Sequence, residues 1–268
     1  MTPDRGAEVA GGRAEADFRI AKVAVVIPVH NEEQHLARAL EGVRAAADVL
    51  QGSRPDTDIG IVVVLDSCTD NSDAVAARFA AVDCRITLLR VSFRSVGKSR
   101  IAGIGAVLNG RCMHYGGADL PHGAGTLWLA NTDADSRVPG GWLLRQVMLA
   151  ESGSDAVLGT VEPDAEGMDS ELLKRWHVRH RLSEDHPYVF GANLGVRASA
   201  YLLAGGFPRQ RSHEDRALVD RLRRRGCRVT STDTVRVLTS GRTEARAPQG
   251  FGAYLLALGR ESAVALEG

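Results

Sequence analysis

Continuous apolar runs alternate along the chain with segments of helical periodicity. The runs at Val23–Val29 and Ile59–Leu65 are rich in β-branched residues, which is typical of strands covered on both faces. Between them, apolar residues recur at every third or fourth position and predict an amphipathic helix, for which Asn31 is the expected N-cap. The apolar residues of that helix are Leu36, Leu40, Val43, Ala47 and Leu50.

The alternation of strands and helices continues through most of the chain. Further extended segments are predicted at Arg85–Val91, Thr126–Ala130, Ala156–Thr160, Tyr188–Val196 and Arg228–Val237. Helices are predicted to end near Phe79 and to span Lys98–Leu108, Trp142–Glu151, Ser170–Leu182, Glu214–Arg225 and Phe251–Leu266. This order favours an α/β fold with a mostly parallel central sheet flanked by helices. Ligands of such sheets bind outside the carboxyl ends of the strands, so polar residues just after each strand are the candidates for a site.

The length of 268 residues suits one large α/β domain. We expect a mobile leader over residues 1–20, a single domain over residues 21–245 and a helical C-terminal segment over residues 246–268. No segment approaches the roughly 18 consecutive apolar residues of a membrane-spanning helix. The sequence therefore predicts a cytoplasmic protein without a transmembrane segment, and peripheral contact with a membrane is compatible with it.

Charge and cysteine content exclude two classes of protein. The 33 basic and 33 acidic residues balance, so no overall field favours nucleic acid as a partner, and any phosphate binding must be local. The four cysteines lack the paired spacing of a structural zinc site.

Two carboxylates, Asp133 and Asp135, follow the apolar strand Thr126–Ala130 directly. Carboxylates at this spacing can converge on one divalent cation, and hard oxygen ligands suit Mg²⁺ or Mn²⁺, which also bind phosphate oxygens. The alternative is that both aspartates cap a helix beginning near Pro139.

Polar residues also gather after the first two strands. The first strand ends in Pro28-Val29-His30-Asn31-Glu32, and the second is followed by Asp66-Ser67-Cys68-Thr69-Asp70-Asn71-Ser72. Asp66 can accept a hydrogen bond from a nucleobase N–H, and Glu32 from a ribose hydroxyl or a base. Asp70 to Ser72 are better explained as caps of the next helix.

These motifs, in this order from about Val23 to Gly241, resemble a family 2 glycosyltransferase with the GT-A fold, a nucleotide-binding, Rossmann-like domain. The family's first strand ends in a P-x-(Y/H)-N-E segment, which Pro28 to Glu32 match, so that Pro28, His30, Asn31 and Glu32 are implied nucleotide-binding residues. A D-x-S-x-D segment follows in the family, and here it begins at Asp66 in a variant form.

The resemblance also implies roles for the next two motifs. Asp66 would contact uracil or guanine, Lys98 or Arg100 would lie near the nucleotide, and Asp133 and Asp135 would bind nucleotide and metal, with Asp135 as the main metal ligand. The basic pair supports this, because cations at the start of a helix oppose its dipole and are better explained by a nearby diphosphate. A solvated basic turn is the alternative.

Downstream, Gly191-Ala192-Asn193 resembles the family's G-A-N segment, which lines the sugar and acceptor region. A tight turn is the competing interpretation of this segment. Trp176 is either a core residue or a platform for stacking on a sugar.

Glu214 and Asp215 resemble the acidic pair that supplies the general base in inverting members of the family. We take Asp215 as the base and Glu214 as the second candidate, because direct displacement at the anomeric carbon needs a carboxylate to take the acceptor's proton. After the last strand, where related enzymes often place a histidine, Arg242 is the candidate for contact with the diphosphate.

The predicted function is metal-dependent transfer of a sugar from a UDP- or GDP-sugar to the hydroxyl of a small-molecule or lipid-linked acceptor, with Mn²⁺ or Mg²⁺ as cofactor. A retaining transferase on the same fold stays open. A sugar-1-phosphate nucleotidyltransferase would carry a glycine- and arginine-rich loop after the first strand, whereas this chain has neither residue there before Arg38. The acidic pair argues against a non-catalytic binding protein, and a homo-oligomer is compatible with the sequence.

Overall fold

The computed structural model describes residues 19–110, 123–210, 212–243 and 250–265, so almost all of the predicted leader lies outside the described residues. The strands are β1 (Lys22–Val29), β2 (Asp58–Asp66), β3 (Ile86–Val91), β4 (Leu127–Asn131), β5 (Ser136–Arg137), β6 (Ala156–Pro163), β7 (Leu194–Arg197) and β8 (Val229–Thr239). The helices are α1 (Leu36–Ser53), α2 (Ser72–Val82), α3 (Val96–Leu108), α5 (Trp142–Glu151), α6 (Ser170–Arg179), α7 (Ala198–Leu203), α8 (Glu214–Arg224) and α9 (Phe251–Ala265). Short 3₁₀ turns are η2 (Ala124–Thr126) and η3 (Gly191–Asn193).

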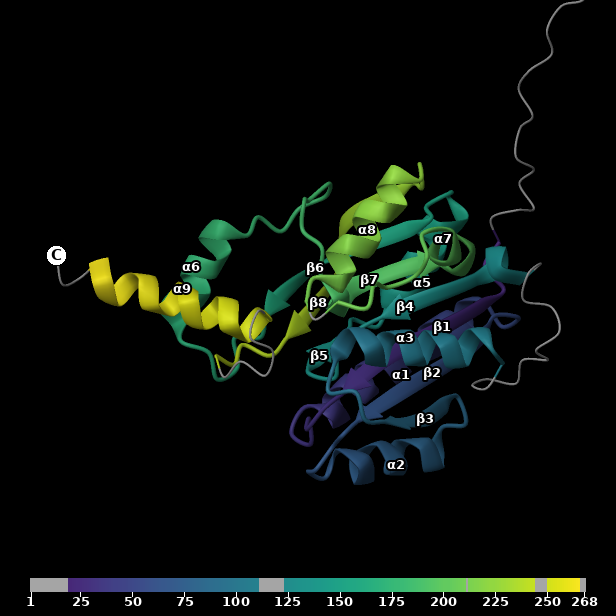
Figure 1. Ribbon diagram of the computed structural model, residues 1–268, viewed down its shortest axis with the longest axis horizontal. Coiled ribbons are helices and arrows are strands. Elements are labelled where there is room, and N and C mark those ends of the chain that lie inside the picture. The colour runs from purple at the N-terminus through teal and green to yellow at the C-terminus, as the bar shows by residue number, and fades with distance from the viewer. Residues whose placement is uncertain (1–18, 111–122, 211, 244–249, 266–268) are drawn as a thin grey trace, which may run out of the picture.

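The described strands form one sheet in the order β3-β2-β1-β4-β7-β6-β8-β5, with helices on both faces (Figure 1). The strands from β3 to β4 are parallel, as predicted. β7 runs antiparallel to both β4 and β6, while β6 and β8 are parallel to one another. The predicted α/β fold with a mostly parallel sheet is confirmed, with one mixed half that the hydrophobic pattern did not reveal.

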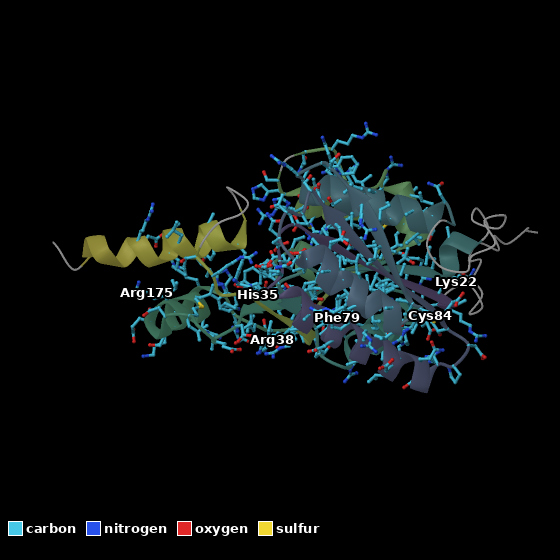
Figure 2. All side chains as sticks on the ribbon, turned by 90° about the horizontal axis from the view of Figure 1, so that it is seen from below. Lys22, His35, Arg38, Phe79, Cys84 and Arg175 are labelled. Atoms are coloured by element: carbon cyan, nitrogen blue, oxygen red, sulfur yellow. The ribbon has the colours of Figure 1, made fainter. Side chains whose placement is uncertain are left out.

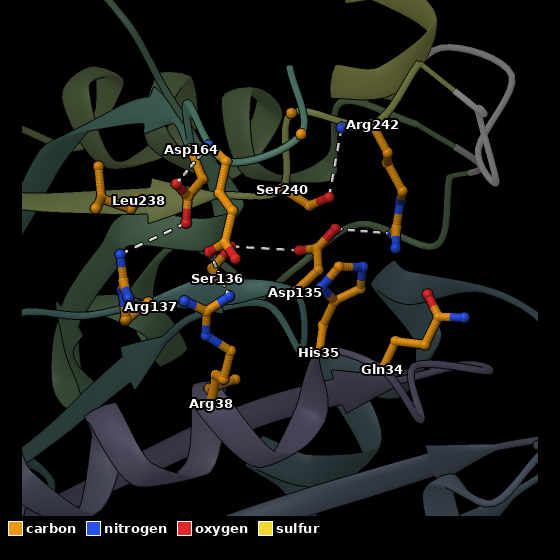
Figure 3. A pocket seen from close by; sticks show the side chains of 14 residues that line it. Gln34, His35, Arg38, Asp135, Ser136, Arg137, Asp164, Leu238, Ser240 and Arg242 are labelled. Carbon is orange, nitrogen blue, oxygen red and sulfur yellow. Dashed lines mark hydrogen bonds and ion pairs between the residues drawn. The ribbon is translucent and has the colours of Figure 1, made fainter.

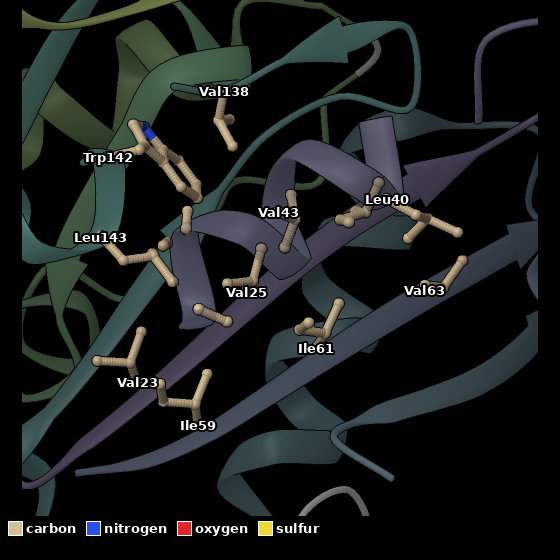
Figure 4. Packing of buried hydrophobic residues seen from close by; sticks show 14 of the residues in the cluster. Val23, Val25, Leu40, Val43, Ile59, Ile61, Val63, Val138, Trp142 and Leu143 are labelled. Carbon is tan, nitrogen blue, oxygen red and sulfur yellow. The ribbon is translucent and has the colours of Figure 1, made fainter. Parts of the chain in front are cut away.

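The two faces of the sheet bury two apolar clusters. Along β1, Val25 and Ile27 belong to the cluster under α1 and α5, whereas Ala24 and Val26 belong to the cluster on the other face. Successive residues of a strand point to opposite faces, so a strand covered on both sides needs an unbroken apolar run. Figure 4 shows the first cluster, in which Val43 of α1 packs over β1 and β2.

Helix α1 begins later than predicted. Its N-cap is His35, after a turn, and Asn31 lies outside the helix with a left-handed backbone at φ 54°. The Asn31 side chain instead accepts a hydrogen bond from the backbone N–H of Thr69 at 2.8 Å. The prediction that Asn31 caps α1 is therefore wrong, because the side chain is used to join two loops.

Helices α6 and α9 pack against each other away from the sheet (Figure 1). A small separate cluster of Leu172, Trp176, Leu255 and Leu258 joins them. In the described ranges, no helix combines the length and the apolar character that crossing a bilayer requires.

Asp83 links the turn after α2 to α1. Its carboxylate accepts hydrogen bonds from Arg85 and from Arg44 of α1, at 2.7–3.1 Å. The hydrogen bonds from Arg85 outweigh burial and lower the pKa of Asp83 from 3.8 to about 2. Since the pKa is lowered on folding, the charged form stabilises the protein above about pH 4, and this contribution is lost as the pH falls towards 2.

Replacing Asp83 by asparagine is expected to lower the free energy of unfolding at pH 7 by about 2 kcal/mol, since one pKa unit corresponds to about 1.4 kcal/mol. Urea denaturation of both proteins from pH 7 down to about pH 3 tests this. The difference between them should shrink as the pH falls below 4. A difference that does not change with pH would assign the loss to packing instead of charge.

Candidate active site

The loops after β1 and β2 are tied together at the carboxyl edge of the sheet. The backbone N–H of Glu32 donates to Ser72 Oγ at 2.7 Å, and that of Glu33 donates to an Asp70 oxygen at 3.0 Å. Asp70 also accepts from the N–H of Ser72, the first residue of α2, whereas the N-cap residue Asn71 makes no capping hydrogen bond with its side chain. Figure 2 shows Lys22, at the amino end of β1, well separated from His35, which lies toward the α6 and α9 side. The predicted strand-end motifs therefore meet at one edge.

Most side chains of the first motif have partners within the protein. Pro28 is buried within β1, and His30 Nδ1 lies 2.6 Å from the backbone oxygen of Asp66. Glu32 is buried and holds the guanidinium of Arg242 with both carboxylate oxygens, at 2.7 and 2.8 Å. The loop after β1 is thus held in place by contacts within the protein, and it brings the charged carboxylate of Glu32 to the site.

The carboxylate of Asp66 organises the segment that leads into α3. It accepts hydrogen bonds from the backbone N–H groups of Phe93, Arg94 and Ser95 and from Ser99 Oγ, at 2.7–2.9 Å. Burial raises the pKa of Asp66, but the hydrogen bonds from Ser95 and its neighbours lower it by more than burial raises it. The net pKa therefore lies below the usual value. A carboxylate has about four acceptor positions, and these donors use them. Contact of Asp66 with a nucleobase stays a prediction.

The two aspartates after β4 each face an arginine. Asp133 accepts a hydrogen bond of 2.5 Å from Arg100, and Asp135 lies 2.8 Å from Arg242. Burial, reinforced by the charge of Asp133, raises the pKa of Asp135 to about 6. Asp135 also accepts longer hydrogen bonds from Ser136 and Thr239. Helix α5 begins at Trp142, and its N-cap receives no side-chain hydrogen bond, so neither aspartate caps it.

Arg100 is a buried cation between the aspartate motif and the acidic pair at the start of α8. Its side chain is 4% exposed, and its two terminal nitrogens donate to Asp133 at 2.5 Å and to Glu214 at 2.6 Å. A Cβ atom at Gly191 would lie 2.5 Å from the same guanidinium, so a side chain at this position would have to displace Arg100. The prediction that Arg100 lies near the nucleotide stays a prediction; its bridging role was not predicted.

Asp215 stands beside Glu214 but is more accessible. One of its oxygens accepts the backbone N–H of Gly191 at 2.8 Å, which joins the G-A-N segment to α8. Lys98 lies exposed in the first turn of α3, next to Gly97, whose Cα faces the side chain of Glu214. The starts of α3 and α8 and the aspartate motif therefore surround one region.

Asn193 and Trp176, for which both a sugar contact and a structural role were open, are buried structural residues. Asn193 is 1% exposed, donates to the carbonyl oxygens of Thr160 and Val235, and accepts from Trp142 Nε1. Trp176 has no exposed surface and stacks on His180 with ring centroids 4.4 Å apart. Neither side chain has a free face for a sugar, and Ala192 beside Asn193 is also buried.

A cavity of about 330 Å³ adjoins the aspartate motif (Figure 3). Asp135 and Arg242 line one part of it, and Arg38 and Arg137 line another. Arg38 pairs with Glu166 and Arg137 with Asp164, both at exposed positions. Sequence reasoning passed over these arginines, although Arg137 follows Asp135 by only two residues.

The donor set fits a hard divalent cation only in part. Asp133 and Asp135 supply carboxylate oxygens of the type that Mn²⁺ and Mg²⁺ prefer. Among the described residues, however, no three His, Cys, Asp or Glu side chains are arranged to hold a metal ion. A cation on the two aspartates would therefore complete its coordination with water or phosphate oxygens.

Comparisons with solved structures identify the fold. A mannosyltransferase from Pyrobaculum calidifontis, solved with GDP-Man and Mn²⁺, matches with a TM-score of 0.57 at 19% identity over 83% of this chain and 57% of its own. GalNAc-T7, solved with UDP, GalNAc and Mn²⁺, gives 0.56 at 12% identity, over 85% of this chain and 46% of its own. Glucosyl-3-phosphoglycerate synthase from Mycobacterium tuberculosis gives 0.51 at 14% identity, over 94% of this chain and 83% of its own. This chain thus spans about half the length of the first two.

No curated protein matches the chain by sequence. The family model described as glycosyl transferase family 2 does match, over residues 24–195. That range contains the strand-end motifs, the paired aspartates and the G-A-N segment. The chain therefore belongs to glycosyl transferase family 2.

Proposed function

We propose that the protein transfers a sugar from a UDP- or GDP-sugar to a hydroxyl acceptor, in a reaction that depends on a divalent cation and inverts the anomeric centre. One observation supports this most strongly. Arg100 joins Asp133 of the aspartate motif to Glu214, which neighbours the proposed base Asp215. The groups for holding a diphosphate and for accepting a proton are thus fixed relative to one another.

Each proposed role follows from chemistry and position. Asp133 and Asp135 would hold the cation, which neutralises charge on the departing diphosphate. Lys98 at the start of α3 would add positive charge beside the diphosphate. Asp215 would accept the proton of the acceptor hydroxyl as that oxygen attacks the anomeric carbon. The three solved structures of the same fold contain Mn²⁺, which supports Mn²⁺ as the cation.

A thermal-shift panel tests the donor site. UDP, GDP, UDP-glucose, UDP-N-acetylglucosamine and GDP-mannose are each added with and without Mn²⁺ to the wild type and to Asp135→Ala. One nucleotide at 100 times its Kd is expected to raise Tm by roughly 5–10 °C in the presence of Mn²⁺. The shift should disappear in Asp135→Ala. Absence of a shift with every nucleotide would contradict the proposed function.

A further inference from the structure

Arg242 contacts two carboxylates of the site at the same time. One guanidinium contacts Glu32 with two hydrogen bonds, at 2.7 and 2.8 Å, and also lies 2.8 Å from Asp135. Glu32 follows β1, Asp135 follows β4, and Arg242 follows β8, so the contact joins three distant parts of the chain. The side chains of Glu32 and Asp135 are 8% and 17% exposed, which leaves little solvent to screen them.

Without this guanidinium, the carboxylates would face one another. Glu32 and Asp135 both contact the same guanidinium, so their carboxylates lie close to one another, and Asp133 is only two residues from Asp135. Arg100 pairs with Asp133 and with Glu214 instead. Arg242 is therefore a cation that contacts Asp135 and Glu32 at the same time in the ligand-free protein.

A divalent cation on Asp135 would compete with Arg242. Both need the same carboxylate, and two positive charges within about 4 Å repel one another strongly where solvent is scarce. A diphosphate offers the displaced guanidinium a pair of anionic oxygens, which arginine binds in the same two-pronged geometry that it uses on Glu32.

We propose that Arg242 couples the binding of the metal to that of the nucleotide: it holds Asp135 in the ligand-free protein and moves to the diphosphate when metal and nucleotide bind together. This inference rests on the proposed function. Metal alone then binds weakly, because it must displace Arg242 from Asp135 and leaves it only the contact with Glu32, whereas a diphosphate offers it further anionic oxygens. Metal and nucleotide each strengthen the binding of the other by the same factor, as linkage requires.

Titration of the protein with Mn²⁺ tests the coupling when it is carried out once without nucleotide and once with UDP or GDP. Free Mn²⁺ is measured by electron paramagnetic resonance. For the wild type, we expect nucleotide to tighten Mn²⁺ binding by about tenfold or more, within the usual range of coupling between sites. Arg242→Gln should bind Mn²⁺ alone about fivefold tighter than the wild type, and its coupling factor should fall by about fivefold or more.

Two variants serve as controls. Arg38→Gln removes an arginine from the same cavity that pairs with Glu166 and not with Asp135, so its Mn²⁺ affinity and coupling should match the wild type. Arg242→Lys keeps the charge but loses the two-pronged contact, and its coupling should lie between those of the wild type and Arg242→Gln.

The outcomes separate the coupling from the proposed function. If the wild type binds Mn²⁺ and nucleotide together, but Arg242→Gln shows the same affinity for Mn²⁺ alone and the same coupling, the role of Arg242 is overturned and the proposed function stands. If the wild type fails to bind Mn²⁺ in the presence of UDP and also in the presence of GDP, both proposals fail. Comparable thermal unfolding of all variants would show that the differences arise in binding.

Discussion

Asp215→Asn is expected to lower kcat by about 10²–10⁴-fold, which is the usual contribution of a general base. The substitution keeps the size of the side chain and its contact with the backbone N–H of Gly191 but removes its ability to take a proton. Within the part of the chain that the structure describes, Asp215 contacts Gly191 and neither Asp135 nor Arg242, so binding of Mn²⁺ and nucleotide should be unchanged. Release of UDP or GDP from the nucleotide sugar, with water as acceptor, measures kcat without a known acceptor.

Asp220→Asn is the matched control, because Asp220 lies on the same helix and pairs with Arg223 at an exposed position. It should leave kcat unchanged. Glu214→Gln should differ from Asp215→Asn, since Glu214 is buried against Arg100 and its loss should also reduce stability. An unaltered kcat in Asp215→Asn, together with retention of the anomeric configuration in the product, would favour the retaining alternative.

The sequence predicted the parallel half of the sheet well because the apolar runs of β1 and β2 are uninterrupted. A strand buried on both faces needs apolar residues at successive positions, and this pattern can be recognised from the sequence. The aspartate motif could be placed at the edge of the sheet because it comes just after β4. The direction of β7 could not be predicted, because its short run from Leu194 to Arg197 carries no information about which neighbours it joins. The two-residue strand β5 exists only through pairing with β8, some 100 residues later.

Residue type predicted where the site lies better than it predicted what each side chain does there. Asn193 and Trp176 are chemically suited to sugar contacts, but burial assigns them to the core. Asp66 ends β2 as predicted, but its hydrogen bonds and those of Arg100 go to protein groups 27 to 114 residues away. Such partners depend on tertiary structure, and no local pattern reveals them.

Arg100→Met is expected to lower the free energy of unfolding by about 3–5 kcal/mol. The substitution approximates the apolar stem of arginine but leaves the carboxylates of Asp133 and Glu214 without their shared cation, and Glu214 is buried. Removing one partner from a buried ion pair is costly because the remaining charge stays desolvated. Arg100→Lys should lose less, since it keeps the charge but has no planar fork to bridge two carboxylates. Urea denaturation at pH 7 measures each change.

A double variant separates the charge from the packing. If the unpaired carboxylate causes the loss, Arg100→Met combined with Glu214→Gln should regain part of the stability that Arg100→Met loses alone. Arg90→Met, which removes an exposed partner of Asp73, should change stability little. A small loss in Arg100→Met, together with loss of the nucleotide-dependent thermal shift, would instead assign Arg100 to direct contact with the nucleotide, because the carboxylates would then not depend on it for folding.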